Sequence, residues 1–241
     1  MTTVPAGAAG PPADKRRYVR EMFSAIAPTY DLLNHLLSLN IDRSWRVRAL
    51  DRLGWEARPE GRYLDACAGT LDFAVALLGR PGFRGRVVGA DFAVPMLRCG
   101  AAKAAGRVLP AGADALRLPF ADGAFDGAFV GFGVRNLADL DAGLAELRRV
   151  LRPGARLVVL DFTTPSFAPL RVLYLFYFRR ILPLVGRLVS GHPTAYDYLP
   201  SSVMEFPSPP ALRARMEGAG FRECGWRLLT GGIAAVHWGE R

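Results

Sequence analysis

Two short apolar segments of the chain each end in a carboxylate, and a loop of small residues follows the first. Residues 62–66 contain Asp65 and lead into a loop with Gly69 and Thr70, and residues 86–90 lead to Asp91. An acid at the end of the second strand of a parallel sheet is positioned to bind the ribose hydroxyls of an adenosine-containing cofactor. We therefore predict that Asp91 binds ribose, and that Gly69 lets the backbone approach the cofactor because it lacks a side chain.

The loop between these segments indicates which cofactor is bound. The pattern G-x-G-x-x-G is absent, and Gly69 is the one glycine of the loop, which disfavours NAD and favours S-adenosyl-L-methionine (SAM). A strand-to-helix turn without any ligand is the alternative. Asp114, followed by Ala115, comes after the third predicted strand, where its carboxylate could accept a hydrogen bond from an adenine amino group or cap a turn.

A second loop with reactive side chains follows the fourth predicted strand. It reads Gly131-Phe132-Gly133-Val134-Arg135-Asn136, and it faces the same edge of a parallel sheet as the other loops. An arginine at this edge can hold an anionic oxygen or orient a water molecule. A solvated loop arginine is the alternative.

The elements that position these loops alternate along the chain. We predict strands at residues 62–66, 86–91, 107–111, 125–130 and 155–161, and helices at 72–79, 94–105, 139–151 and 208–219. This alternation is typical of an α/β fold with a parallel sheet and right-handed crossovers. Pro153 and Gly154 predict a sharp turn before the fifth strand. The last two strands, 222–230 and 232–239, are expected to form a hairpin at Gly231 and Gly232.

Two regions lie outside this alternating pattern. We predict a disordered tail at residues 1–14 and a single domain over 15–241. The domain begins with a helical cap at 15–53, which Pro28 is expected to break. Residues 165–206 form an inserted segment, rich in aromatic residues and arginine, that suits a membrane interface or the mouth of a lipid-tail tunnel. A core helix with surface arginines is the alternative.

Composition limits the class of partner. The chain has 241 residues and a net charge of +9, which favours an anionic partner such as nucleic acid, a phospholipid surface or an acidic ligand. Nucleic acid is disfavoured, because neither an Asn/Asp-Pro-Pro-aromatic motif nor a Pro-Cys pair is present. The cysteines and histidines are few and scattered, so we expect no metal site and reduced thiols in the cytosol. Arg179 and Arg180 interrupt the longest apolar stretch, which argues against a membrane-spanning helix.

Several motifs together resemble the UbiE/MenG-type quinone C-methyltransferases, from about Val19 to Gly239. They are Ile26-Ala27-Pro28-Thr29-Tyr30-Asp31, Phe132-Gly133-Val134-Arg135-Asn136, Arg149-Val150-Leu151-Arg152-Pro153-Gly154 and Tyr196-Asp197-Tyr198-Leu199. The resemblance implies a class I SAM-dependent methyltransferase fold, Rossmann-like, with a seven-stranded, mostly parallel sheet whose last strand is antiparallel. It also implies methyl transfer to a ring carbon of a polyprenyl quinol. By position, Thr70, Asp91 and the Asp114-Ala115 pair match SAM contacts, and Asp65 matches an acid near the methionine end.

The chain departs from this family's pattern in the cofactor loop. The family's loop reads Gly-Gly-Thr-Gly-Asp, whereas this chain has Ala68-Gly69-Thr70-Leu71-Asp72. A positive φ at Leu71 would cost roughly 1–2 kcal/mol, and its side chain could crowd the cofactor. Gly131 stands beside SAM where the family has Ser. These departures leave open a non-catalytic protein that binds quinone or a partner and has lost SAM binding.

Under the enzyme hypothesis, Arg135 stabilises the oxyanion that develops on the quinol, directly or through water, and Asn136 assists. His192 and Tyr196 are weaker candidates. We expect the substrate mouth at residues 169–189 and 18–39, and a cytoplasmic protein that contacts the anionic inner face of the cell membrane. The type of quinol, naphthoquinol or benzoquinol, its tail length and the oligomeric state stay open.

Overall fold

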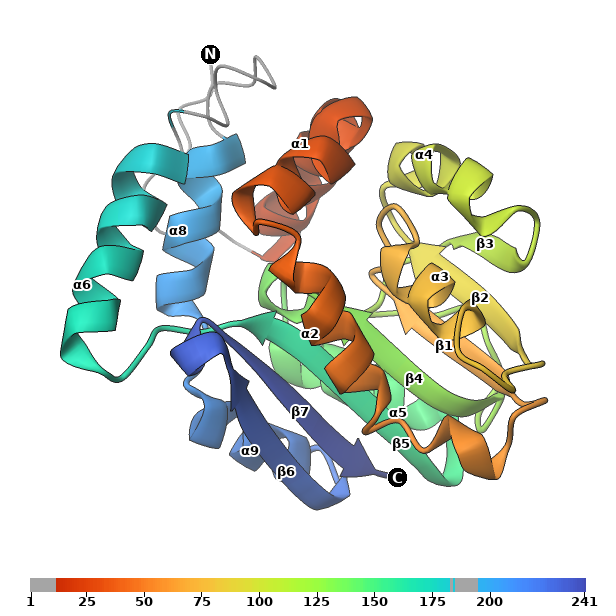
Figure 1. The fold of residues 1–241 in the computed structure, drawn as a ribbon. Helices are drawn as coiled ribbons and strands as arrows, with labels where there is room; N and C mark the ends of the chain where they lie inside the picture. The colour runs from red at the N-terminus through yellow and green to blue at the C-terminus, as the bar shows by residue number, and fades with distance from the viewer. Residues whose placement is uncertain (1–11, 183, 185–194) are drawn as a thin grey trace.

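A seven-stranded sheet forms the centre of the protein (Figure 1), with the strand order β3-β2-β1-β4-β5-β7-β6. The computed structural model describes residues 12–182, 184 and 195–241. The strands are β1 (Arg62–Ala66), β2 (Arg86–Asp91), β3 (Val108–Gly112), β4 (Phe125–Gly131), β5 (Leu151–Phe162), β6 (Arg222–Leu229) and β7 (Ala234–Glu240). Strands β1 to β5 pair in parallel, and β7 runs antiparallel to both β5 and β6. The predicted fold class and C-terminal hairpin are therefore confirmed.

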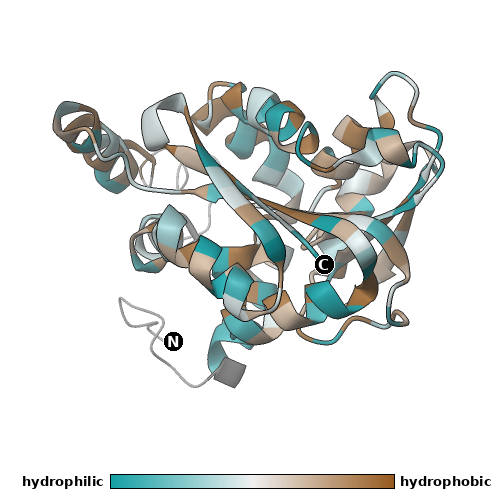
Figure 2. Cartoon of the chain, turned by 90° about the horizontal axis from the view of Figure 1, so that it is seen from below, coloured by the Kyte–Doolittle hydropathy of each residue, from teal (hydrophilic) through white to brown (hydrophobic). Residues whose placement is uncertain are grey.

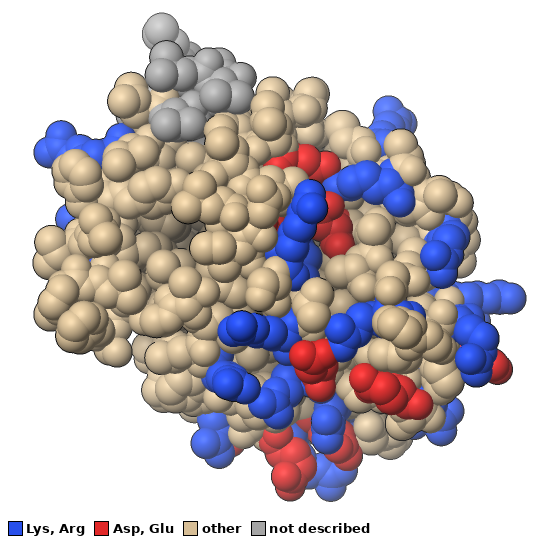
Figure 3. Space-filling model, viewed as in Figure 1, with Lys and Arg blue, Asp and Glu red and all other residues tan. Residues whose placement is uncertain are grey.

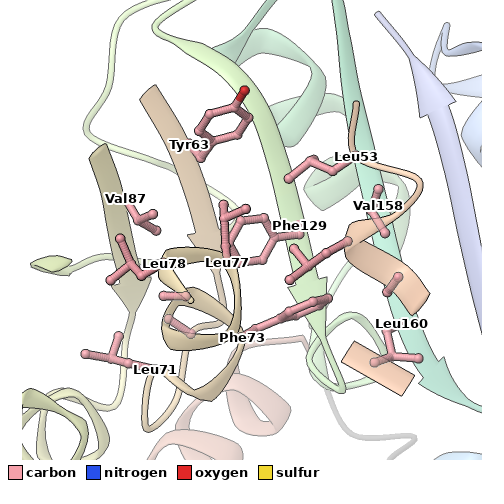
Figure 4. Packing of buried hydrophobic residues seen from close by; sticks show 14 of the residues in the cluster. Leu53, Tyr63, Leu71, Phe73, Leu77, Leu78, Val87, Phe129, Val158 and Leu160 are labelled. Carbon is pink, nitrogen blue, oxygen red and sulfur yellow. The ribbon is translucent and has the colours of Figure 1, made fainter. Parts of the chain in front are cut away.

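Helices cover both faces of the sheet, which Figure 2 shows between two helical layers. One layer holds α2 (Ile41–Leu50), α3 (Asp72–Leu78) and α4 (Val94–Ala104), and the other holds α5 (Leu140–Val150) and α9 (Pro209–Gly218). Buried aliphatic and aromatic side chains fill the space between each layer and the sheet. Figure 4 shows the first of these cores, where Phe73 and Leu77 of α3 meet Phe129 of β4. Strands β1 to β5 are parallel and are buried between the two helical layers. The loops at the carboxyl ends of these strands therefore lie on one edge of the sheet.

Three further helices form a separate group beyond the carboxyl end of β5. They are α1 (Pro12–Leu37), α6 (Ala168–Phe176) and α8 (Ala195–Glu205), and η3 (Tyr177–Ile181) continues α6 as a π-helical turn. The short helices η1 (Trp55–Ala57), η2 (Val134–Asn136) and η4 (Thr230–Gly232) connect other elements. In the group of three, Met22, Ile26 and Leu33 of α1 pack with Tyr174, Phe178 and Leu182 in a third core. These helices lie side by side in Figure 1 and leave the cavity described below between them and the sheet.

Three local predictions need correction. Helix α1 begins at Pro12, inside the segment predicted as a tail, and residues 1–11 lie outside the described part. Pro28 does not break the helix, because the buried face of α1 packs on either side of it and outweighs one lost backbone hydrogen bond. The pair Pro153-Gly154 lies within β5 at a shift of register rather than in a helix-to-strand turn.

Candidate active site

A small cavity lies where the strands β2, β3 and β4 end. Most of the predicted cofactor residues line it: Gly69, Asp91, Asp114, Ala115 and Gly131. They come from loops that are far apart in sequence, and the parallel sheet brings them together because its strands end on one edge. An acid at the end of β2 and another after β3 are the groups expected for the sugar and base of an adenosyl cofactor. The residues present therefore fit the cofactor that the sequence predicts, and we call this small cavity the cofactor cavity.

The Asp91 carboxylate is fixed by the backbone around it. One oxygen accepts a hydrogen bond from the Gly69 amide at 2.8 Å, and the other accepts one from the Ala93 amide at 2.8 Å. Asp91 is 7% exposed, and this burial raises its pKa to about 6, although both amides favour the charged form. The carboxylate is thus held at a defined position with lone pairs remaining for two ribose hydroxyls.

Asp65 and Thr70, which were also predicted to bind the cofactor, are placed differently. Asp65 is 1% exposed, does not line the cavity and accepts a hydrogen bond from the Ala74 amide at 2.9 Å in the first turn of α3. Burial raises its pKa well above the usual value. The Thr70 hydroxyl donates to the carboxylate of Asp31 on α1, so it connects the cofactor loop to the N-terminal helix.

Leu71 adopts a positive φ, with φ 67° and ψ 15°, so the backbone strain that such a conformation implies is present. Its side chain does not crowd the cofactor cavity, because it is 1% exposed and belongs to the core of α3 shown in Figure 4. Two glycines make room for it: a Cβ added to Gly89 would lie 2.5 Å from Leu71 Cδ2, and one on Gly100 would lie 2.9 Å from Cγ. The steric argument for loss of SAM binding is therefore wrong.

This packing predicts an unusual order of stabilities. Leu71→Ala removes the buried side chain and keeps an unfavourable backbone, at a cost of about 2–5 kcal/mol in the free energy of unfolding. Leu71→Gly removes the same side chain but relieves about 1 kcal/mol of backbone strain, so it should be the more stable of the two. Urea unfolding of both variants checks the order, and an Ala variant more stable than the Gly variant would contradict it.

Gly131 also has a structural reason for being glycine. A Cβ at this position would lie 2.8 Å from Cδ1 of Phe73, whose ring packs on Phe129 with ring centroids 4.8 Å apart. Serine at position 131 would clash with this aromatic pair unless the rings moved. The exchange of serine for glycine therefore goes together with Phe73 and does not by itself indicate a lost cofactor site.

Helix α1 closes the cofactor cavity from above. Arg16, Val19, Phe23 and Tyr30 of α1 line it, and Arg16 forms an ion pair of 2.6 Å with Asp114. The remaining volume is about 60 Å³, room for a few water molecules. An adenosyl group needs more space than this.

A second, larger cavity of about 510 Å³ lies next to the small one. Side chains of α1, α6, η3 and α8 line it together with residues from the ends of β4 and β5, and most of them are aliphatic or aromatic. Phe23, Tyr30 and Phe132 line both cavities and therefore separate them. Figure 3 shows a hollow on this side of the molecule, within a broad face that has few charged residues.

Arg135 is the one charged residue among the described residues that line the large cavity. Its Nη1 atom lies 2.6 Å from Oδ1 of Asp161 and donates a hydrogen bond to the Phe132 carbonyl at 2.5 Å. The guanidinium lies 5.4 Å from the centre of the Phe162 ring. Since the side chains of Arg135 and Asp161 are 5% and 2% exposed, the pair is shielded from water and its orientation is fixed.

Asn136, the other predicted catalytic residue, lines the small cavity next to Arg135. Its amide nitrogen donates to the Phe132 carbonyl at 3.3 Å, and its amide oxygen accepts from the Tyr198 hydroxyl at 3.2 Å. Tyr198 lines the large cavity, so this hydrogen bond links the two cavities. His192 lies outside the described residues, as does the side chain of Tyr196.

Sequence reasoning missed Tyr30, although it lies in a motif that carried the family resemblance. Tyr30 lines both cavities, and burial raises its pKa to about 12, while the charges of Arg135 and Arg46 oppose the shift. No local pattern indicates which face of a helix will separate two cavities.

Side-chain atoms of His35, Asp42 and Asp72 lie within 4.8 Å of one another. Arg46 and Lys103 pair with the two carboxylates, so the cluster is an ion-pair network.

The strand order, the acid at the end of β2 and the paired cavities define a SAM-dependent methyltransferase of the Rossmann-like class. A similar fold is found in a SAM-dependent methyltransferase of Thermotoga maritima described as a possible histamine N-methyltransferase, with a TM-score of 0.66, 20% identity, and coverage of 91% of this chain and 98% of that one. The model of the ubiE/COQ5 methyltransferase family matches residues 12–241, and the chain belongs to this family.

Relatives of known name support the assignment over almost the whole chain. The demethylmenaquinone methyltransferase of Thermus thermophilus is 52% identical over 91% of this chain and 100% of its own length. The demethylmenaquinone methyltransferase of Deinococcus radiodurans is 44% identical over 96% of each chain. The ubiquinone/menaquinone biosynthesis C-methyltransferase of Geotalea daltonii is 43% identical over 95% of this chain and 98% of its own. The protein is thus a SAM-dependent methyltransferase of quinone biosynthesis.

Among the described residues, no helix is both long and apolar enough to span a membrane.

Proposed function

We propose that the protein transfers a methyl group from SAM to a ring carbon of demethylmenaquinol, a naphthoquinol with a polyprenyl tail. The observation that carries the proposal is the shared wall of Phe23, Tyr30 and Phe132 between the two cavities. Asp91 lies in one cavity and Arg135 in the other, which suits a polar cofactor on one side and an apolar ring on the other. When bound, SAM supplies a methyl group that is already activated for transfer.

The residues of the large cavity would make the ring carbon nucleophilic. A quinol becomes reactive when one hydroxyl gives its proton to a general base or to water oriented by Arg135, because the charge then spreads to the adjacent ring carbon. After this carbon has taken the methyl group, it releases its hydrogen as a proton to water, and the ring becomes aromatic again. Arg135 would stabilise that oxyanion in an environment of low polarity, where the interaction is stronger than in water. Asp161 keeps the guanidinium oriented, and Asn136 orders the loop between the cavities.

The choice of a naphthoquinol is supported by the relatives at 52% and 44% identity, which are named demethylmenaquinone methyltransferases. The test uses purified protein, SAM with a labelled methyl group, and a short-tailed demethylmenaquinol kept reduced. We expect a product in which one labelled methyl group replaces a ring hydrogen, and none with the oxidised quinone, which has no hydroxyl to ionise. Methylation of a short-tailed demethylated benzoquinol instead would assign the protein to the other quinol class.

We further propose that the protein works at the cytoplasmic inner face of the cell membrane. The mouth of the large cavity carries exposed apolar side chains: Leu173 is 64% exposed, Phe176 58% and Leu39 76%. Arg179 and Arg180 are exposed on η3 beside them, where they could meet anionic headgroups. In Figure 3 this part of the surface, on the left of the view, has few charges compared with the right and lower parts of the same view. An apolar surface of this kind, rimmed by arginines, fits a lipid bilayer in which the substrate tail resides.

The docking proposal predicts the effect of charged substitutions at the mouth. Leu173→Glu/Phe176→Glu should weaken binding to vesicles containing anionic lipid by roughly a hundredfold or more, because each of the two buried apolar side chains contributes about 1.5–3 kcal/mol. Leu109→Glu is a matched control, since Leu109 is 57% exposed on the edge strand β3 at the far end of the sheet. Vesicle sedimentation at low and high salt measures both variants. Equal binding of the two would refute the docking surface.

A further inference from the structure

The large cavity contains polar atoms without a hydrogen-bond partner. Within the described part of the chain, Asn34 Nδ2, Arg135 Nε and the Tyr174 hydroxyl are buried and unpaired, and all three residues line this cavity. Buried polar groups in folded proteins almost always have a partner, and leaving one unpaired is energetically unfavourable. These three atoms, on residues that line one cavity, have no protein partner among the described residues, so they are available to a ligand that itself carries hydrogen-bonding atoms.

The three groups come from separate walls of the cavity. Asn34 lies on α1 one helical turn after Tyr30, which separates the two cavities. Tyr174 lies on α6 and is 5% exposed, and its ring stacks on Phe178 with centroids 4.4 Å apart. Phe178 in turn packs on Phe162, and the Arg135 guanidinium lies over Phe162. The aromatic contacts therefore hold the Tyr174 hydroxyl at a defined place relative to Arg135.

The charges of the three groups differ in a way that matches a half-ionised quinol. Arg135 is cationic and suits the ring oxygen that has lost its proton. Asn34 is neutral, and Tyr174 stays protonated because burial raises its pKa more than the charge of Arg135 lowers it. The un-ionised hydroxyl of the quinol both donates and accepts, so it can accept a hydrogen bond from the Asn34 amide nitrogen and donate one to the Tyr174 oxygen at the same time.

We propose that Asn34 and Tyr174 are positioning residues that together bind the un-ionised ring hydroxyl of the quinol. With Arg135 on the other ring oxygen, the ring is held at both ends, and the carbon beside the ionised oxygen faces the wall shared with the cofactor cavity. This inference rests on the proposed function and adds how the acceptor ring is oriented.

The test compares two acceptors with several forms of the enzyme. One acceptor is a short-tailed demethylmenaquinol, and the other is its analogue in which hydrogen replaces the un-ionised hydroxyl. Removing that hydroxyl changes the intrinsic reactivity of the ring equally for every enzyme. The ratio of kcat/KM between the acceptors therefore changes from one enzyme to another only through contacts with this hydroxyl.

We expect Tyr174→Phe and Asn34→Leu each to lower the kcat/KM ratio about five- to tenfold relative to wild type, mainly through loss on the parent quinol. Tyr177→Phe is the control, because Tyr177 also lines the cavity but its hydroxyl donates to the Leu37 carbonyl at 2.8 Å. The control should keep the wild-type ratio. Calorimetry with SAM and thermal unfolding verify that the variants bind the cofactor and fold.

A wild-type ratio in both the Tyr174 and Asn34 variants would overturn the inference and assign these groups to bound water. If the wild-type enzyme methylates the parent quinol while the ratios do not change, the proposed function stands and only the positioning role is lost. If the wild-type enzyme methylates neither acceptor, the proposed function itself fails and the inference fails with it.

Discussion

The double variant Arg135→Gln/Asp161→Asn is expected to lose about a hundred- to a thousandfold in kcat and to bind SAM as tightly as wild type. The loss follows from removal of the group that stabilises the oxyanion, an effect of this size for one preorganised donor. SAM affinity should be retained because Arg135 lines the large cavity and not the cofactor cavity. Transfer of a labelled methyl group measures kcat, and calorimetry measures the affinity.

Both residues must be changed because they form a buried ion pair, with Arg135 Nη1 and Asp161 Oδ1 2.6 Å apart. Removing Arg135 alone leaves a buried carboxylate without its partner, which costs about 3–5 kcal/mol of stability. The single variant Arg135→Ala would therefore mix a folding defect with a catalytic one. A double variant that folds and keeps the wild-type kcat would show that Arg135 has no role in the transfer step.

Asp91→Asn is expected to weaken SAM binding about a hundredfold; because it also removes the acceptor of one of the two backbone amides that bind the carboxylate, thermal unfolding is measured alongside. The carboxylate is the acidic group at the end of β2 that lines the cofactor cavity, and hydrogen bonds to a charged group contribute about 1.5–3 kcal/mol each. Asp126→Asn is a matched control: Asp126 also accepts a backbone N–H, from Arg62 at 2.9 Å, but does not line the cavity. Calorimetric titration that gave both variants the same SAM affinity would exclude Asp91 as the ribose ligand.

The raised pKa of Asp91 gives this site a pH dependence. Ribose hydroxyls need the carboxylate form, so SAM affinity should be constant above neutral pH and fall about tenfold per pH unit below about 6. The stability effect has the opposite sign. In the free protein, a pKa raised from 3.8 to about 6 means that the folded state binds the proton more tightly, so this group adds stability as the pH falls through 6. Weaker SAM binding at pH 5 would therefore not arise from unfolding caused by Asp91.

The order of strands and helices could be predicted because each element carries a local signal. Asp91 ends an apolar run of strand length, and a helical pattern follows, so its place at the edge of the sheet needed no information from elsewhere in the chain. Asp114 and Gly131 were placed by the same reasoning. Asp65 was placed less well, because the end of a strand does not show whether a carboxylate faces the cavity or the first turn of the next helix.

Other features depend on contacts between residues that are distant in sequence. The burial of Leu71 depends on Gly89 and Gly100, and Gly131 depends on Phe73. The substrate mouth was expected at residues 169–189 and 18–39, but helical periodicity predicts only that faces are apolar and not which faces meet to form a cavity. Tyr30 was therefore missed, because its position between the cavities is set by how α1 packs over the sheet.

The wall that α1 builds between the cavities has a kinetic consequence. Phe23 and Tyr30 of the same helix line both compartments, so methyl donor and acceptor meet across one shared set of side chains. We therefore expect a sequential scheme in which both substrates are bound in a ternary complex before methyl transfer, and in which movement of the N-terminal helix affects the release of both products.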